Sequence, residues 1–295
     1  MWLNEPLPFI QDFIGDLDKG LQVHNPEVKL SVTQRGWLGF CLMGIILTNS
    51  ICWARFERMS LGKYKIAALS WMFRKSKLPW ALMLQIGVGL ILERHGIKAG
   101  VLVTDDSDHQ RSKKTPKLFR IHKIKDKSSG GYINGQNIVL LMLVTEKVSL
   151  PVGFEIYQPD PAKQAWVKED KQLLKKGIKK SNRPPAPPKD ADYPTKSQLV
   201  LRLMEQFKHH HPQITVKAIV ADALYGQADL MNAAAALFDG TQVISQLRHN
   251  QNIHFRNRIQ SLRQYFESYP GVEQKLSIRG QEPITATVGS CSDLQ

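Results

Sequence analysis

Cysteine is scarce in this chain, and its scarcity excludes two classes of protein. Only three cysteines (Cys41, Cys52 and Cys291) occur among 295 residues, an odd number without pair spacing. This usage argues against a disulfide scaffold or a zinc site and favours a reducing compartment. The first residues, Met-Trp-Leu-Asn-Glu-Pro, lack the basic segment that begins a secretory signal. We therefore expect a cytoplasmic protein.

Long apolar runs are also missing. A membrane-spanning helix needs about 20 consecutive apolar residues. Residues 36–54 carry no charge, but Thr48, Asn49 and Ser50 interrupt the run, and residues 78–92 form a second run that is short. Both runs predict buried core helices, so no membrane partner is expected.

Acidic residues are outnumbered by basic ones. The chain has 40 Lys and Arg against 26 Asp and Glu, a formal net charge of +14. Residues 51–200 hold 28 of the basic and 13 of the acidic residues, so the whole excess lies in the middle half. This balance predicts a polyanionic partner, either nucleic acid or an acidic membrane surface.

Residues 1–98 predict an all-α N-terminal domain. Cap and breaker residues place helices over 33–47, with Thr33 as N-cap, over 50–59, over 63–74 and over 79–95. Basic residues Arg74 and Lys75 lie between the last two helices, close to Trp71 and Trp80. Such a pattern suits a DNA-binding module, and equally an ordinary helical cap on a larger domain.

Residues 99–250 predict an α/β domain with a mixed sheet. Apolar, β-branched strands are expected at 100–104, 137–145, 150–157, 215–221 and 241–247, with helices at 195–211 and 227–238. Three consecutive strands followed by αβ units indicate a mixed sheet with flanking helices. The segments 106–131 and 158–194 are predicted to be polar connections, the second a Lys- and Pro-rich linker.

Three histidines, His209 to His211, end the helix predicted at 195–211. At this place a cationic side chain interacts favourably with the helix dipole. We prefer this interpretation to a metal site.

Two acidic residues stand where a metal centre could form. Asp106, in Asp105-Asp106-Ser107-Asp108, follows the first predicted strand, and Asp222 follows the fourth. Acids at the ends of adjacent strands converge at one sheet edge, where Mg²⁺ or Mn²⁺ would accept their oxygens. Two such ions promote phosphodiester cleavage. The structural alternatives are a turn at Asp106 and a helix cap at Asp222.

Five segments together resemble bacterial DDE-type insertion-sequence transposases. They are Val103-Thr104-Asp105-Asp106-Ser107, Arg111-Ser112-Lys113-Lys114, Lys125-Asp126-Lys127-Ser128-Ser129-Gly130-Gly131-Tyr132, Val152-Gly153-Phe154 and Ala221-Asp222-Ala223-Leu224-Tyr225-Gly226. The resemblance implies a ribonuclease H-like core and Mg²⁺-dependent cleavage and strand transfer at transposon ends. It implies a nucleoid-associated homodimer on double-stranded DNA, with Asp106, in preference to Asp105, as the first acid and Asp222 as the second.

The basic residues nearest these motifs are the candidates for DNA contact. They are Arg111, Lys113, Lys114, Lys125 and Lys127 in the sheet domain, with Arg74 and Lys75 in the helical one.

The third acid of the family is the departure from its pattern. These transposases carry a Glu in a Tyr, Arg, Glu, Lys signature on a late helix, after a β-rich insertion. Here a helix at 251–269, which carries Glu267 without that signature, precedes strand-like runs at 274–279 and 283–288. We expect residues 251–295 to be an incomplete insertion in a truncated transposase, with reduced activity. Glu267 is the weaker candidate for the third ligand.

Two alternatives remain open. A non-catalytic remnant would bind DNA in a salt-sensitive manner without cleaving it. A haloacid dehalogenase-like phosphatase also places Asp-x-Asp after its first strand, as in Asp106-Ser107-Asp108. That family would need Thr or Val at position 110, where this chain has Gln110, and it does not explain the basic middle half.

Overall fold

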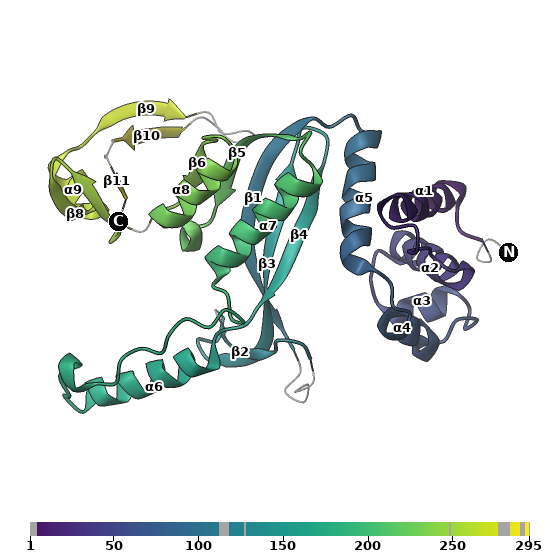
Figure 1. The fold of residues 1–295 in the computed structure, drawn as a ribbon, viewed down its shortest axis with the longest axis horizontal. Helices are drawn as coiled ribbons and strands as arrows, with labels where there is room; N and C mark the ends of the chain where they lie inside the picture. Colours follow the sequence, from purple (N-terminus) through teal and green to yellow (C-terminus); the bar gives the residue numbers. More distant parts are fainter. Residues whose placement is uncertain are drawn as a thin grey trace. The chain divides into compact units, whose positions relative to one another are not determined.

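The computed structural model describes residues 5–111, 118–126, 128–247, 249–276, 284–289 and 293–294 (Figure 1). The chain divides into two compact units, Met1–Ile97 and Lys98–Gln295. The first unit is helical and the second is built on a mixed sheet. Each unit has its own hydrophobic interior and is described by itself.

The helical unit contains five helices among its described residues: α1 (Pro8–His24), α2 (Val32–Thr48), α3 (Trp53–Met59), α4 (Ile66–Lys75) and α5 (Trp80–Arg94). Its core gathers residues from all of them, including Leu21, Phe40, Phe56, Leu69 and Met83. Gly44 of α2 lies against the Phe56 ring, and a Cβ there would sit 2.7 Å from it. The glycine therefore lets α2 and α3 approach closely.

Helix α2 begins earlier than the sequence predicts. Ser31, not Thr33, is the N-cap, and it forms a capping box with Gln34. The Ser31 hydroxyl accepts from the Gln34 amide, while the Gln34 side chain accepts from the Ser31 amide. Because this pair satisfies two orphan donors at once, it prevails over the single cap at Thr33.

Within the described residues, no single helix is long and apolar enough to cross a membrane. Helices α2 and α3 reach that length and composition only when taken together, and the chain bends by 91° between them. The apolar run of α2 instead supplies buried residues such as Trp37 and Phe40 to the core of the unit.

The second unit is organised around a six-stranded mixed sheet. Its strands are β1 (Ala99–Gln110), β2 (His122–Lys125), β3 (Tyr132–Val144), β4 (Ser149–Tyr157), β5 (Thr215–Ala221) and β6 (Val243–Ser245). β1 pairs antiparallel with β3, and β3 with β4, whereas β5 runs parallel to β1 and β6 parallel to β5. The predicted ribonuclease H-like mixed sheet is confirmed, with β1 at its centre.

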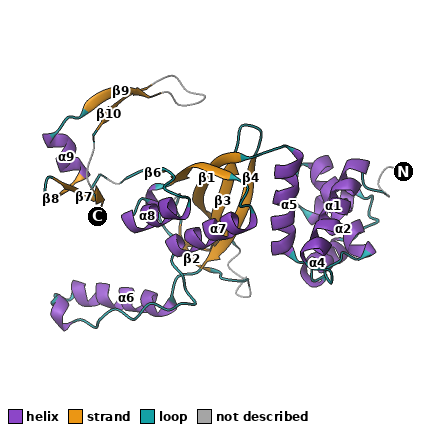
Figure 2. Cartoon of the chain, turned by 45° about the horizontal axis from the view of Figure 1, so that its top comes forward, coloured by secondary structure: helices purple, strands orange, loops and turns teal. Residues whose placement is uncertain are grey.

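Two helices cover one face of this sheet (Figure 2). α7 (Lys196–His210) buries one apolar stripe, made of Leu199, Val200, Leu203, Met204 and Phe207, and contacts β3 and β4. α8 (Ala228–Leu237) packs beside α7. Gly153 of β4 lets α7 lie close, because a Cβ there would sit 3.0 Å from Leu203. The small residue in β4 therefore allows α7 to pack closely against the sheet.

The first strand is longer than predicted. β1 continues through Gln110, so Asp105, Asp106 and Asp108 lie within the strand rather than after it. The continuation is held by antiparallel pairing with β3, which reaches from Val101 to Gln110. Polar residues have low strand propensity, but the long neighbouring strand overrides it. The segment 106–131, expected to be only a connection, also contains β2.

The segment 158–194 is a helix and a return segment, not a plain linker. α6 (Pro161–Lys175) is capped by Asp160, whose carboxylate accepts from the Ala162 and Lys163 amides. A short 3₁₀ turn, Lys180–Asn182, precedes the prolines. The many lysines hid this helix, since its apolar residues are few.

Strands replace most of the helix predicted at 251–269. β7 (Asn252–Phe255) and β8 (Arg258–Ser261) form a hairpin, and only Leu262–Ser268 is helical, as α9. Arg256 and Asn257 turn the hairpin with positive φ. β9 (Val272–Leu276) pairs with β10 (Ile284–Val288), and β11 (Asp293–Leu294) pairs with β7. Alternating polarity, rather than helical spacing, governs residues 252–261.

Candidate active site

Asp106 lies on the central strand, on the face that the helices cover. Its partner across the ladder is Val139 of β3, which is fully buried. Side chains alternate along a strand, so Leu102, Thr104 and Asp106 share one face. Leu102 and Thr104 are buried, while the Asp106 side chain keeps 17% of its exposure. Along this face of β1, the side chains therefore change from fully buried at Leu102 to partly exposed at Asp106.

The Asp106 carboxylate is held by two side chains from neighbouring elements. Lys196 Nζ, at the first position of α7, lies 2.5 Å from Asp106 Oδ2. Asn137 Nδ2, on β3, donates to the same oxygen at 2.9 Å and also to Asp108 Oδ1. One amide therefore bridges two carboxylates on the same strand, and one ammonium neutralises Asp106.

The start of α7 fixes the place of Lys196. Thr195 caps the helix through a capping box with Gln198, so the helix begins at Lys196. The Lys196 ammonium also lies over the Tyr157 ring, 5.3 Å from its centre. Burial and the charge of Asp160 raise the pKa of Tyr157. A cation between a carboxylate and an aromatic face gains from both contacts.

Asp222 follows β5 directly, as its sequence position predicts. It caps the 3₁₀ turn Ala223–Tyr225, and its Oδ1 accepts from the Ala223 amide. The side chain is exposed. The parallel register aligns Thr104 with Ala221, so Asp105 and Asp222 come next on neighbouring strands. The structural role that the sequence allowed for Asp222 is present together with this placement.

A buried tyrosine connects the acids. Tyr225 is fully buried, and its hydroxyl has no hydrogen-bond partner among the described residues. Burial raises the pKa of Tyr225 above its usual range, and the charges of Asp106, Asp105 and Asp222 raise it further. All three carboxylates therefore act on one phenol. The parallel pairing of β1 with β5 accounts for this, because Asp106 lies two residues beyond Thr104 and Asp222 one residue beyond its aligned partner Ala221.

The donor set suits a hard divalent cation. Carboxylate oxygens are the ligands that Mg²⁺ and Mn²⁺ prefer. Asn137 Oδ1 is buried without a hydrogen-bond partner among the described residues, an orphaned oxygen beside the acids. No three His, Cys, Asp or Glu side chains within the described ranges are yet placed to hold an ion. A metal ion bound to Asp106 would replace Lys196 as the cation that neutralises the Asp106 carboxylate.

Glu267 has a different setting. It pairs with Arg263 one turn earlier on α9, at 2.9 Å, and both side chains are largely exposed. It also lines a shallow depression with Leu247, His249, Leu262 and Phe266. Glu267 is not among the carboxylates whose charge raises the pKa of Tyr225. The described contacts do not join it to Asp106 or Asp222.

The predicted DNA contacts fall in two groups. Arg111, just past the end of β1, is half-buried, and its Nε donates to Gln136 at 2.8 Å. Lys125 ends β2 and is exposed, as are Arg74 and Lys75 at the end of α4. Lys113, Lys114 and Lys127 lie outside the described residues. Arg111 thus has a side-chain partner, whereas Arg74 donates only to the Ser70 carbonyl of its own helix, at 3.2 Å.

The turn after Lys125 is ordered by the next residue, Asp126. Asp126 accepts from the amides and hydroxyls of Ser128 and Ser129. These bonds hold the pKa of Asp126 at about 2. The turn therefore keeps its negative charge, and it presents Lys125 beside that charge.

Three residues of the site are not predicted from the sequence: Asn137, Lys196 and Tyr225. Asn137 is a polar residue inside an otherwise apolar strand, which is a usable signal because burial of an amide requires partners. Lys196 at the start of a helix is unfavourable for the helix dipole and hence also a signal. Tyr225 lies in the family-like segment that contains Asp222, but the segment alone does not indicate a role for this tyrosine.

One of the three histidines, His211, differs from the prediction, whereas His209 and His210 lie exposed in the last turn of α7. His211 is buried, and its ring is tilted against the ring of Phe207, with the ring centres 5.4 Å apart. Burial, with a smaller contribution from His210, lowers the pKa of His211 to about 4. His211 is therefore neutral at pH 7 and cannot act as a cationic partner of the helix dipole.

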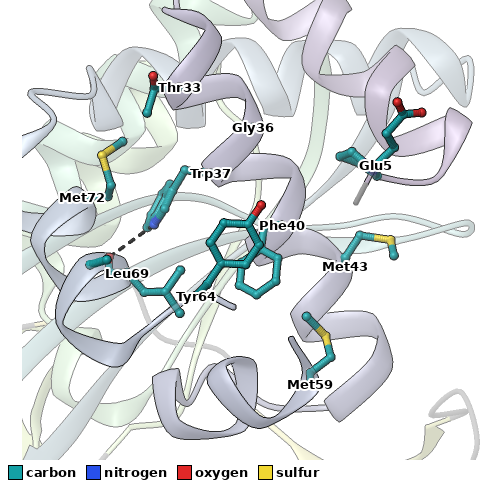
Figure 3. A pocket seen from close by; sticks show the side chains of 12 residues that line it. Glu5, Thr33, Gly36, Trp37, Phe40, Met43, Met59, Tyr64, Leu69 and Met72 are labelled. Atoms are coloured by element: carbon teal, nitrogen blue, oxygen red, sulfur yellow. Dashed lines mark hydrogen bonds between the residues drawn. The ribbon is translucent and has the colours of Figure 1, made fainter. Parts of the chain in front are cut away.

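A separate cavity lies in the helical unit. It measures about 340 Å³ and is lined mainly by aromatic and methionine side chains (Figure 3). The Trp37 indole N–H donates to the Leu69 carbonyl at 3.2 Å. Glu5 is the only charged residue of the lining. The cavity lacks the paired acids that distinguish the sheet edge.

The second unit therefore combines a ribonuclease H-like mixed sheet with a carboxylate on its central strand, Asp106, and another directly after the neighbouring parallel strand, Asp222. The family model described as DDE superfamily endonuclease matches residues 29–268. The chain therefore belongs to this DDE endonuclease family, and the resemblance to DDE-type transposases is confirmed. None of the curated proteins matches the chain. The family supports a transposase or nuclease type of function on DNA.

Proposed function

We propose that the chain catalyses divalent-metal-dependent cleavage and strand transfer of DNA at the ends of an insertion sequence. The observation that carries this proposal is the parallel pairing of β1 with β5, with Asp106 two residues beyond the aligned Thr104 and Asp222 one residue beyond the aligned Ala221. Two carboxylates from adjacent parallel strands, in a member of the DDE endonuclease family, suit phosphodiester chemistry. The haloacid dehalogenase alternative is not supported, because Asp106 and Asp108 lie inside β1.

Asp106 and Asp222 would hold the metal. When bound, Mg²⁺ or Mn²⁺ would polarise the scissile phosphate and lower the pKa of the attacking water or 3′-hydroxyl. Asp106 lies on β1 and Asp222 directly follows β5, so the pairing of these two strands limits the spacing of the two acids. Strand pairing positions functional groups more precisely than loops do.

Three other side chains have supporting roles. Asn137 orients Asp106 and Asp108 through its amide nitrogen. Lys196 stabilises the Asp106 carboxylate before a metal binds and supplies a cation for the phosphate afterwards. Tyr225 excludes water beneath the acids, because its side chain is fully buried. The roles of Asn137 and Lys196 follow from their contacts with Asp106, and the role of Tyr225 follows from its burial.

A plasmid-nicking assay tests the proposal. The full-length protein is incubated with Mg²⁺ and a supercoiled plasmid that carries its own terminal repeats, beside the Asp106→Ala and Asp222→Ala variants. We expect slow nicking by the wild type, because the third acid of the family pattern is missing, and loss of nicking in both variants, while Glu267→Gln, the matched control, retains the wild-type rate. Nicking that persists in Asp222→Ala would contradict the proposal. DNA binding without any nicking would instead favour the non-catalytic remnant.

A further inference from the structure

Residues 161–189, here called the basic arm, extend from the sheet as α6 and a proline-rich return segment. Figures 1 and 2 both draw the return segment alongside α6. The arm holds nine Lys and Arg against two acidic residues. α6 has no buried residue, so the hydrophobic core of the unit does not explain why this helix is present.

The arm is packed on itself along one side of α6. The half-buried residues of the helix are Trp166, Val167, Asp170 and Leu173, which lie on one face. The Trp166 indole N–H donates to the Pro184 carbonyl at 2.8 Å. Arg183 of the return segment pairs with Asp170 at 2.8 Å, with only 11% of the Arg183 side chain exposed. A hydrogen bond and an ion pair therefore fasten the prolines to this face.

The opposite face of α6 carries a row of lysines. Lys168, Lys171 and Lys175 follow each other at helical spacing, all exposed and away from the Trp166 face. The described ion pairs join none of them to a carboxylate. Seven residues of helix span about 10 Å, a length over which duplex DNA carries about six phosphate charges. Like charges placed in a row repel each other, which is costly unless a polyanion neutralises them.

Both ends of the arm are rooted at the Asp106 site. Its first residue comes shortly after Tyr157, the last residue of β4, which pairs across the ladder with Asn137. Its last residue comes shortly before Lys196, the partner of Asp106, and Lys196 in turn lies over the Tyr157 ring. A nucleic acid that reaches Asp106 therefore passes the base of the arm.

We propose that the lysine face of the basic arm binds the phosphate backbone of duplex DNA that enters the Asp106 site. This inference rests on the proposed function, which makes DNA the substrate, and it adds the surface that aligns the duplex. Phosphate contacts of this kind are independent of sequence and strongly dependent on salt. The helix sets the spacing of the three lysines, and the proline-rich return segment stiffens the helix.

The salt dependence of DNA binding tests the inference. Affinity for a labelled 40-base-pair duplex is measured by fluorescence anisotropy from low to high NaCl, without divalent metal so that no cleavage occurs. We compare the full-length wild type with a triple variant, Lys168→Gln, Lys171→Gln and Lys175→Gln, and with the matched triple Arg variant. The slope of log affinity against log salt should fall by up to about 2.7 in the Gln variant, and the Arg variant should keep the wild-type slope.

The outcomes separate the two proposals. An unchanged slope in the Gln variant, with firm binding by the wild type, would overturn the role of the arm and leave the proposed function standing. Absence of DNA binding in the wild type would overturn both. Circular dichroism checks that the Gln variant is folded, which we expect because the three side chains are exposed. The inference would also be overturned if the Gln variant lost binding to phosphatidylserine vesicles while its salt slope on DNA stayed at the wild-type value.

Discussion

The site around Asp106 and the basic arm treat charge in opposite ways. At the site, each described charge has an internal partner: Lys196 faces Asp106, and Asn137 joins Asp106 to Asp108. On the arm, Lys168 and its neighbours project into solvent without a described carboxylate partner. The first region is paired within the protein, whereas the second is left for an external anion.

This difference separates the two tasks of a DNA-cleaving enzyme. Preorganised, partly buried groups suit chemistry, because they do not have to reorganise when charge develops. Exposed cations suit alignment of a polyanion, because counterion release from DNA supplies the free energy. Substitutions at the site should therefore change catalytic rates, whereas substitutions on the arm should change salt-dependent affinity.

The largest effect is expected from a carboxylate exchange that contrasts two residues of β1. Asp106→Asn should lower the nicking rate by about 10³-fold or more, because it removes a metal-binding oxygen. Asp108→Asn should lower the rate by less than about tenfold, since Asp108 is exposed and is held only through Asn137. Single-turnover nicking rates in Mg²⁺ measure both. Equal losses in the two variants would remove the distinction between these acids.

A second effect concerns the far end of α7, the helix that begins at Lys196. The pKa of His211 falls from 6.5 to about 4 on folding, so the unfolded chain binds more protons between these values. The stability contributed by His211 is present above pH 6.5 and is lost as the pH falls toward 4. We expect a loss of about 2 kcal/mol in the free energy of unfolding between pH 7 and pH 5.

Urea unfolding at the two pH values measures this loss. A His211→Phe variant serves as the control, because it keeps the buried ring without the titrating group. The variant should show a smaller change between pH 7 and pH 5 than the wild type. An equal change in both proteins would contradict the assignment to His211.

The smallest effect is expected at Lys196. Replacing Lys196 by Met removes a cation next to Asp106 and should tighten Mn²⁺ binding by about tenfold, or about 1.4 kcal/mol. The same change should lower the melting temperature of the metal-free protein, because Asp106 loses a partner. Lys196→Arg is the control that keeps the charge. Mn²⁺ affinity that is unchanged in the Met variant would show that Lys196 does not compete with the ion.

The sequence predicts the sheet better than the site, for a reason visible in β1. Apolar, β-branched residues 100–104 identify the strand, but its extension through Asp106 depends on pairing with β3, which lies far along the chain. Periodicity reports local burial and says nothing of such pairing. The same reason explains why β2 was taken for a connection.

The site was predictable only in part. Asp106 and Asp222 stand out as acids beside strands, and the family motif singles them out. Lys196 and Asn137 could not be assigned to Asp106 from the sequence, because they are separated from it by 90 and 31 positions and meet it only in the folded sheet. Likewise the arm was taken for a linker, since its stabilising contacts join Trp166 to Pro184 and Asp170 to Arg183.

Mn²⁺ binding tests most directly whether Asp106 and Asp222 form one metal centre. The free Mn²⁺ signal in electron paramagnetic resonance gives the affinity for the wild type, Asp106→Asn, Asp222→Asn and the double variant. Residues that act on one ion are not additive, so each single variant should lose the tightest site and the double variant should lose nothing further. Losses that add in the double variant, or tight binding that survives Asp106→Asn, would contradict a shared centre.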